Sequence, residues 1–171
     1  YDQQEYRMLG ALSKDVKMKE LIEAGYDVHT GTASEVFKVD PEKVEEKQRD
    51  TAKTILFAIT YGMGLSKLAN KLGGDIDLEK YGWYTQPVAK AMTKYNCGWA
   101  EAEERYVNSP SNSHTSQTYL NFVKGKEYAN SEYVKKEIQK ARELRNSLLD
   151  GFPQMKEYME YQKEFASKHG Y

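Results

Sequence analysis

The chain has 171 residues, of which 30% are charged and 39% hydrophobic, and its formal net charge is −1. This length supports one domain with a moderate core, and the charge balance excludes a generally basic coat for nucleic acid while leaving room for a local basic face. The lone cysteine, Cys97, excludes a disulfide framework and suits a reducing, cytoplasmic location. No apolar run is long enough to span a membrane, and no Met precedes Tyr1, so we expect a trimmed piece of a longer cytoplasmic protein.

The first forty residues predict short helices after a mixed start. Alternating side chains over residues 1–12 predict the end of a strand that leads into a helix. Ser13 is then expected to be the N-cap of a helix over about 14–24, which Gly25 ends. Residues 30–37 predict another helix.

Asp40-Pro41 is an N-cap followed by proline at the first helical position. A longer helix follows the charged run after it and is expected to end at Tyr61, where Gly62 releases the chain. One face of this helix is apolar and is predicted to pack inside, through Ala52, Ile55, Leu56 and Ile59.

The other face carries four residues spaced by four, Arg49, Lys53, Phe57 and Tyr61. At helical spacing these side chains lie near one another, and we call them the cation–aromatic row. Two cations followed by two rings suit a ligand with a polyanionic end and a flat end, because cations neutralise phosphates and rings stack on a base. The structural alternative is a solvated basic pair next to an aromatic pair buried in the core.

Beyond a short helix at 65–72, residues 73–135 are harder to interpret. A helix is predicted from about 85 to 107, and four aromatic residues, Trp83, Tyr84, Trp99 and Tyr106, are expected to form a small core. Arg105, Lys124 and Lys126 are cations that lie among aromatic residues and could touch DNA. An insertion that only packs, with no contact to DNA, is favoured. Neither Cys97 nor His114 has the companions that a metal site needs.

The last part of the chain has a strong helical pattern. Apolar residues recur at spacings of three and four over residues 134–148, and Gly151-Phe152-Pro153 breaks the helix. A final helix is predicted over about 154–168.

Four motifs, in this order, resemble family A DNA polymerases of the bacterial polymerase I type. Residues 1–7 (YDQQEYR) resemble the palm motif of that family, 25–30 (GYDVHT) its Gly-x-Asp-Ile-His-Thr segment, and 152–159 (FPQMKEYM) a later helix. The cation–aromatic row with Gly62 resembles the helix of the fingers subdomain. The resemblance covers about 1–72 and 136–171.

The resemblance implies a mainly α fold, the helical fingers subdomain of a right-hand polymerase with a helical insertion. It implies a palm remnant at 1–12, fingers at 13–72, an insertion at 73–135 and closing helices at 136–171. In this family a dNTP is bound by the positions that correspond here to His29, Arg49, Lys53, Phe57 and Tyr61.

Three further positions match the palm motif. The residue corresponding to Glu5 blocks the ribose 2′-OH and contacts the tyrosine of the row, while Gln3 and Arg7 belong to the palm remnant. Phenylalanine at position 57 implies discrimination against dideoxynucleotides.

The complete enzyme of this family uses two Mg²⁺ ions, held by two palm aspartates, to extend a primer. Neither aspartate is expected in this chain, so the resemblance implies no catalytic and no metal-binding residue here and no polymerisation by the chain alone. The expected partners are a dNTP, primer–template DNA and the palm and thumb of the polymerase, with no membrane. Departures from the family pattern, such as Leu56-Phe57-Ala58, hint at a phage lineage and hence at a host cytoplasm.

Two alternatives stay open. A single-subunit RNA polymerase shares the Arg-Lys-Tyr-Gly helix but usually has methionine at the position of Phe57. The other is a non-enzymatic helical module that docks a partner.

Overall fold

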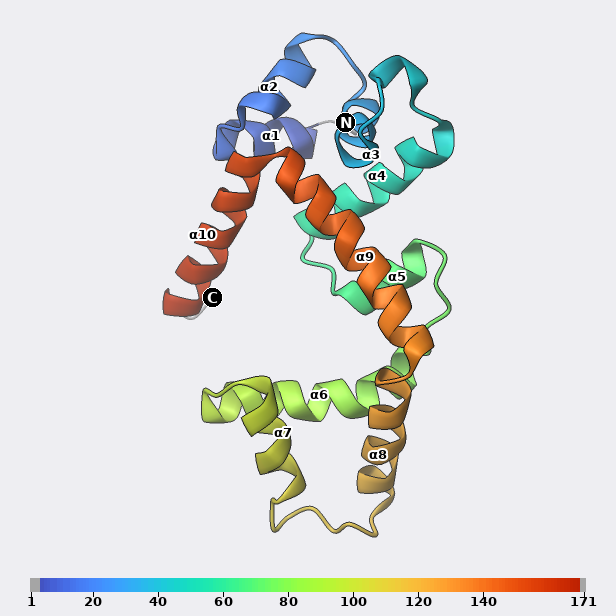
Figure 1. Ribbon diagram of the computed structural model, residues 1–171. Coiled ribbons are helices and arrows are strands. Elements are labelled where there is room, and N and C mark those ends of the chain that lie inside the picture. The colour runs from blue at the N-terminus through green and yellow to red at the C-terminus, as the bar shows by residue number, and fades with distance from the viewer. Residues whose placement is uncertain (1–3, 170–171) are drawn as a thin grey trace. The chain divides into compact units, whose positions relative to one another are not determined.

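The computed structural model describes residues 4–169, apart from the side chain of Glu5. Within that range the chain forms α-helices and one short 3₁₀ helix, with no strand, which confirms the predicted mainly α class (Figure 1). The chain divides into two compact units. The first combines the chain up to Gly64 with the chain from Ala141, and the second is Leu65–Lys140.

The first unit begins with three helices, α1 (Gln4–Ser13), α2 (Val16–Glu23) and α3 (Val28–Phe37). The strand predicted at 1–12 is wrong over the described residues, because Tyr6, Gly10 and Ser13 are buried at helical spacing on α1. Ser13 was also wrongly expected to cap the next helix. It ends α1, and the cap of α2 is Asp15, whose carboxylate accepts a 3.1 Å hydrogen bond from the Met18 amide.

The rest of the first unit comprises the 3₁₀ helix η1 (Pro41–Lys43), α4 (Glu46–Thr60), the later part of α9 (Glu132–Gly151) and α10 (Pro153–His169). The predicted Asp40 cap is confirmed, since its side chain accepts from the Glu42 amide at 3.1 Å.

A buried carboxylate ties the beginning of this unit to its end. Asp15 is fully buried and accepts from the Met155 amide at 3.0 Å as well as from the Met18 amide. One side chain therefore accepts from one amide in the first turn of each of α2 and α10, where the amides have no partner inside their own helix.

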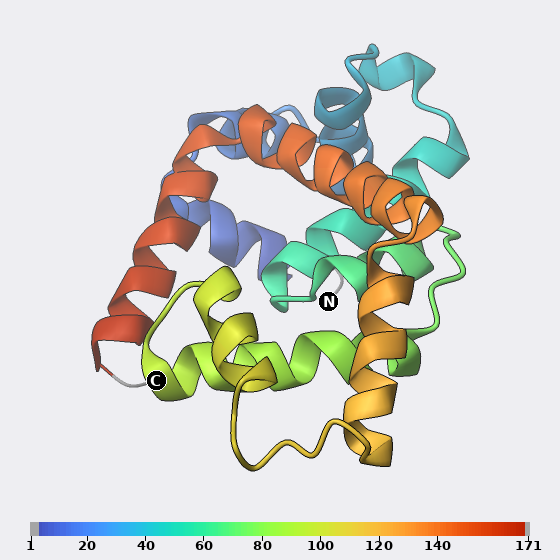
Figure 2. The same cartoon turned by 60° about the horizontal axis from the view of Figure 1, so that its bottom comes forward.

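The second unit contains α5 (Leu65–Lys71), α6 (Leu78–Tyr95), α7 (Trp99–Val107), α8 (Gln117–Ala129) and the start of α9. Figure 2 shows the yellow loop that joins α7 to α8 from a second side. The core of this unit consists of Tyr84, Val88, Ala91, Ala102 and Phe122.

Tyr84 also anchors a polar chain beside this core. Its hydroxyl donates to Glu103 at 2.8 Å and accepts from the Trp99 indole at 3.1 Å, and Lys126 forms an ion pair with Glu103. The predicted aromatic core is therefore confirmed for Tyr84 and Tyr106. It is wrong for Trp83, which is outside this cluster, and for Trp99, whose ring touches Tyr84 but keeps 38% of its surface exposed.

The single helix predicted over 85–107 is wrong, because the chain forms two helices there. Asn96 adopts a left-handed conformation with φ of 47° and ends α6, and Gly98 is the N-cap of α7. The predicted start of the helix near residue 85 is also wrong. Helix α6 begins at Leu78, after Asp77, whose carboxylate accepts from the Lys80 amide at 3.0 Å. The left-handed backbone at Asn96 and the extended backbone at Gly98 therefore outweigh the apolar pattern and divide the helix.

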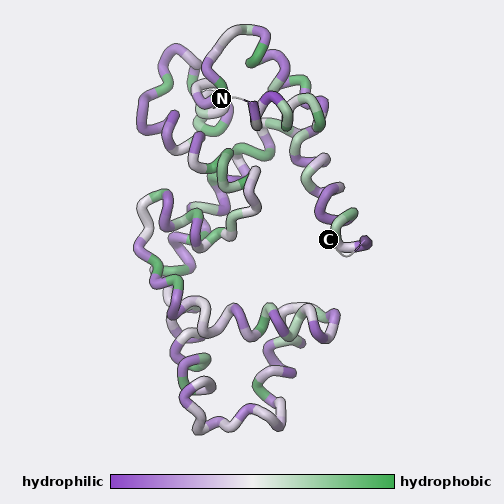
Figure 3. The backbone as a smooth tube through the Cα atoms, turned by 180° about the vertical axis from the view of Figure 1, so that it is seen from behind, coloured by the Kyte–Doolittle hydropathy of each residue, from purple (hydrophilic) through white to green (hydrophobic). Residues whose placement is uncertain are grey.

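No helix within residues 4–169 is long and apolar enough to cross a membrane. The tube in Figure 3 alternates between hydrophilic and hydrophobic colours in both units.

Candidate functional site

Helix α4 has one buried and one exposed face. The predicted packing of Ala52, Ile55, Leu56 and Ile59 is confirmed, since all four are buried. Phe57 and Tyr61 on the other face are 53% and 56% exposed. The structural alternative, in which the two rings pack into the core, is therefore wrong for this unit.

The two exposed rings touch each other. Their centroids lie 4.4 Å apart with 39° between the ring planes. Just beyond them the helix ends in a Schellman motif, in which the Met63 amide donates to the Ala58 carbonyl at 2.8 Å and Gly62 has a φ of +64°. The rings thus form an exposed aromatic pair at the carboxyl end of α4.

The two cations of the row have different surroundings. Lys53 is exposed, and no carboxylate of the described residues lies within ion-pair distance of it. Arg49 is half-buried, and its Nε donates to the Asp27 carboxylate at 2.8 Å. Lys53 therefore offers a charge ready for an anion, whereas Arg49 is already held in place.

Asp27 joins α3 to α4. It is the N-cap of α3, and its Oδ2 accepts from the Thr30 amide and the Thr30 hydroxyl, both at 3.1 Å, in addition to Arg49. Burial alone would raise the pKa of Asp27, but the hydrogen bonds from Arg49 and Thr30 outweigh it and lower the pKa below its usual value. In turn the hydrogen bond to Asp27 raises the pKa of Arg49.

The pair brings the first turn of α3 to the beginning of α4. His29 lies in that turn, two residues after Asp27, and is half-buried. The structure therefore places His29 on the helix that is tied to Arg49, and the contribution of its side chain to the face stays a prediction. We call this surface, formed by His29, Arg49, Lys53, Phe57 and Tyr61, the α3–α4 face.

The palm-motif positions are less informative. Arg7 is exposed on α1. Gln3 and the side chain of Glu5 lie outside the described residues, so the predicted contact between Glu5 and Tyr61 stays a prediction.

The cations noted in the second unit are engaged with carboxylates or lie on its surface. Arg105 pairs with Glu101 at 2.8 Å and Lys126 with Glu103, while Lys124 is exposed. Within the part of the chain that the structure describes, no three His, Cys, Asp or Glu side chains gather as a metal site.

Sequence reasoning gave Asp27 no role of its own, although it belonged to a quoted motif. The signal available was the Asp-x-x-Thr spacing, which is typical of an N-cap that bonds the residue three positions later. Its ion pair with Arg49, 22 residues further on, is a tertiary contact with no local signature.

Comparison with known proteins identifies the class. Residues 1–127 match the model of DNA polymerase family A, and the chain belongs to that family. The match extends from α1 into α8 and so includes the α3–α4 face.

Individual relatives agree with this class. The chain is 43% identical over 75 residues to the thermostable DNA polymerase I of Thermus filiformis, which is 44% of this chain and 9% of that protein. It is 39% identical over 80 residues to DNA polymerase I of Chloroflexus aurantiacus, and 38% over 73 residues to that of Deinococcus radiodurans. Those matches cover 47% and 43% of this chain. Each spans 8% of the relative, so the matched stretch is about a tenth of those proteins.

Proposed function

We propose that the chain forms the fingers part of a template-directed DNA polymerase and that its α3–α4 face binds the incoming dNTP. The observation that carries the proposal is the exposure of Phe57 and Tyr61 in line with Lys53, while the opposite side of α4 is buried. An ordinary amphipathic helix directs its aromatic residues to the core. Rings left in solvent next to cations are better suited to a base that carries phosphates.

Each residue of the face has a role that follows from its surroundings. Lys53 and Arg49 neutralise the triphosphate, and His29 adds a donor. Among the contacts of the described residues, the Asp27 pair uses Nε of Arg49, which leaves the terminal NH₂ groups for a phosphate oxygen. Phe57 packs near the sugar and base, and Tyr61 stacks on the template side of the new base pair.

The complete polymerase would supply the rest. The proposal includes primer–template DNA, a palm and a thumb as partners, with α4 rotating inward when the base pair fits. It also includes Glu5 as the group that excludes a ribose 2′-OH. We assign nucleotide binding alone to the described residues. The two palm aspartates that hold magnesium in the resembled family match no position of this chain, so we expect no polymerisation by the isolated chain.

The family match favours one of the alternative functions over another. The chain matches a family of DNA polymerases, which favours a DNA polymerase over a single-subunit RNA polymerase. A module that merely docks a protein partner would not need Lys53, and this distinction can be tested.

The test is a titration of the chain with dTTP, followed by NMR of the backbone amides. We expect saturable shifts at His29, Arg49 and Lys53, with weak, millimolar affinity because the other partners are missing. Lys53→Ala should abolish them. Lys47→Ala removes an exposed lysine from the same helix outside the row and should leave them unchanged. Equal behaviour of the two variants, or no shift with the complete polymerase and primer–template, would contradict the proposal.

A further inference from the structure

The second unit contains a hollow that the α3–α4 face does not use. Its volume is about 630 Å³, within the range of pockets that hold small organic ligands. Its walls come from α6, α7, the loop that joins α7 to α8, and the first turns of α8. All of its lining residues belong to the second unit.

The hollow is basic at one end. Lys90 and Lys94 lie one turn apart on α6, and Arg105 reaches it from α7. Neither lysine has a carboxylate within ion-pair distance among the described residues, while Arg105 is held by Glu101 at 2.8 Å. This local excess of positive charge contrasts with the net charge of −1 of the whole chain.

The carboxylate that lines the hollow, Glu79, lies at the other end. It is eleven residues before Lys90 on the same helix, so it is roughly 16 Å away along the axis, at about 1.5 Å per residue. An anion can therefore approach the lysine end without meeting Glu79.

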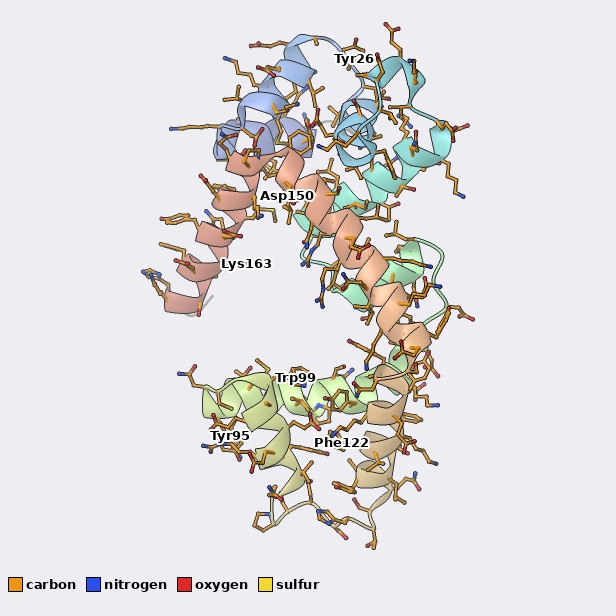
Figure 4. All side chains as sticks on the ribbon, in the orientation of Figure 1. Tyr26, Tyr95, Trp99, Phe122, Asp150 and Lys163 are labelled. Atoms are coloured by element: carbon orange, nitrogen blue, oxygen red, sulfur yellow. The ribbon has the colours of Figure 1, made fainter. Side chains whose placement is uncertain are left out.

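An aromatic ring sits among the cations. The Tyr95 ring has Lys94 at 5.0 Å from its centroid and the Arg105 guanidinium at 4.9 Å, and it is 39% exposed. Figure 4 shows Tyr95 at the carboxyl end of α6 and Trp99 at the start of α7. The cations are thus positioned around a ring that still has free surface.

The remaining walls combine a second ring with polar groups. Trp83 is half-buried and lines the hollow together with Gln86, Asn112 and Asn121. The Asn112 amide donates to the Tyr106 carbonyl and the Asn121 carbonyl accepts from Gln117, which leaves the Asn112 oxygen and the Asn121 NH₂ group for a ligand. Amides can donate and accept, which suits the edges of a nucleobase. Cations, rings and amides in one hollow match the three parts of a nucleotide: phosphate, base face and base edge.

We propose that this hollow binds a nucleotide unit of single-stranded DNA. The phosphate lies on Lys90, Lys94 and Arg105, and the base stacks on Tyr95. A single strand presents base faces that a duplex hides. Because the chain belongs to a family of DNA polymerases, a DNA strand is the polyanion that we expect this hollow to bind. The site is separate from the α3–α4 face, so either can fail without the other.

The chain carries its own reporter for this site. Its two tryptophans are Trp83 and Trp99, both in the second unit. Tryptophan fluorescence of the whole chain therefore reports on the second unit, and Trp83 lines the hollow itself. We expect a (dT)₁₂ oligonucleotide to quench it saturably, and free dTMP to bind at least tenfold more weakly because it brings one phosphate and one base.

Charge is tested with two double variants. Lys90→Ala with Lys94→Ala should weaken (dT)₁₂ binding about tenfold and reduce the slope of log affinity against log salt by about 1.4, since each lysine accounts for about 0.7 on a single strand. Lys124→Ala with Lys135→Ala removes the same charge from exposed positions of this unit that do not line the hollow. This control pair should change the affinity for (dT)₁₂ by less than about twofold relative to the unaltered chain.

Stacking is tested at the ring. Tyr95→Ala should weaken binding fivefold or more, and Tyr95→Phe should restore it, because stacking needs the ring and not the hydroxyl. Lys53→Ala should leave the quenching unchanged, which separates this site from the dNTP face. Circular dichroism of each variant verifies that the helices are intact, and Lys90→Gln with Lys94→Gln replaces the alanine pair if they are not.

Several results would overturn the proposal. They are the absence of quenching at millimolar nucleotide, equal losses in the two lysine pairs, and full affinity in Tyr95→Ala. If dTMP binds as tightly as (dT)₁₂, the hollow takes free nucleotides and the assignment to a single strand is wrong.

Discussion

Asp27 gives the sharpest test of how the α3–α4 face is held together, because one carboxylate performs two separable tasks. It caps α3 through Thr30 and it forms the ion pair with Arg49. Asp27→Ala removes both. Asp27→Asn keeps a side-chain oxygen that can cap the helix but removes the charge.

The magnitudes follow from the exposure of the groups. Loss of an N-cap costs about 1 kcal/mol. The side chains of Arg49 and Asp27 are 39% and 35% exposed, so solvent screens the pair and its loss costs only about 0.5 kcal/mol. We therefore expect Asp27→Ala to lower the free energy of unfolding by about 1.5 kcal/mol and Asp27→Asn by about 0.5 kcal/mol.

The assay follows urea unfolding by circular dichroism at 222 nm, with amide hydrogen exchange at Thr30 as the local readout. Exchange at Thr30 should accelerate in Asp27→Ala and stay slow in Asp27→Asn. Tryptophan fluorescence, which reports on the second unit, should show the same urea midpoint in all three proteins.

The pH dependence of stability checks independently that the pKa of Asp27 is lowered and not raised by folding. The folded pKa of Asp27 is lowered, so its ionised form stabilises the fold above the ordinary aspartate pKa of about 3.9, and this contribution is lost as the pH falls through the folded pKa. The difference in unfolding free energy between wild type and Asp27→Asn should therefore be present at pH 7 and shrink below about pH 4. Equal losses in the two variants at pH 7, or a difference that grows in acid, would refute the reasoning.

Two further predictions concern the packing of each unit. Gly125→Ala should destabilise the second unit by about 1–3 kcal/mol, seen in urea unfolding by tryptophan fluorescence, because the new Cβ would lie 2.8 Å from the Lys80 carbonyl oxygen. At Gly98 a Cβ meets nothing within 4 Å. Alanine there is a poorer N-cap, which costs about 0.5–1 kcal/mol, but it restricts the unfolded chain by a similar amount, so Gly98→Ala should change stability by only about a few tenths of a kcal/mol; a larger loss there than at Gly125 would contradict the packing argument. Asp15→Ala should lower the stability of the first unit by about 2–4 kcal/mol, since it leaves the buried amides of Met18 and Met155 without their acceptor. Circular dichroism should show that loss, and a change below that of Asp27→Ala would mean that the buried amides find other partners.

Local chemistry made much of this fold predictable. Asp40-Pro41 and Gly62 act within a few residues of themselves, so the beginning of η1 and the end of α4 followed from the sequence. The apolar face of α4 was also predictable, because Ala52, Ile55 and Ile59 have no competing polar role. The break at Asn96 was missed, since asparagine in a left-handed C-cap looks no different in the sequence from asparagine on a helix surface.

The tertiary parts were not predictable. Nothing near Asp15 shows that its carboxylate also accepts from Met155, 140 residues away. For the candidate site, the sequence supplied the row and its exposed rings, but not the ion pair that holds Arg49 against α3. It also named Tyr106 and Arg105 without indicating the hollow, which depends on how α6, α7 and the loop before α8 pack.

The bond from Asp15 to Met155 has a consequence for the order in which the protein can be made. The second unit is continuous in sequence, whereas the first is closed by residues that follow it. During synthesis from the amino end, residues 65–140 can fold as soon as they leave the ribosome. The earlier helices must wait, with Asp15 short of one of its two donors, until α10 has been translated. The unit whose helices are begun before the other is therefore completed after it.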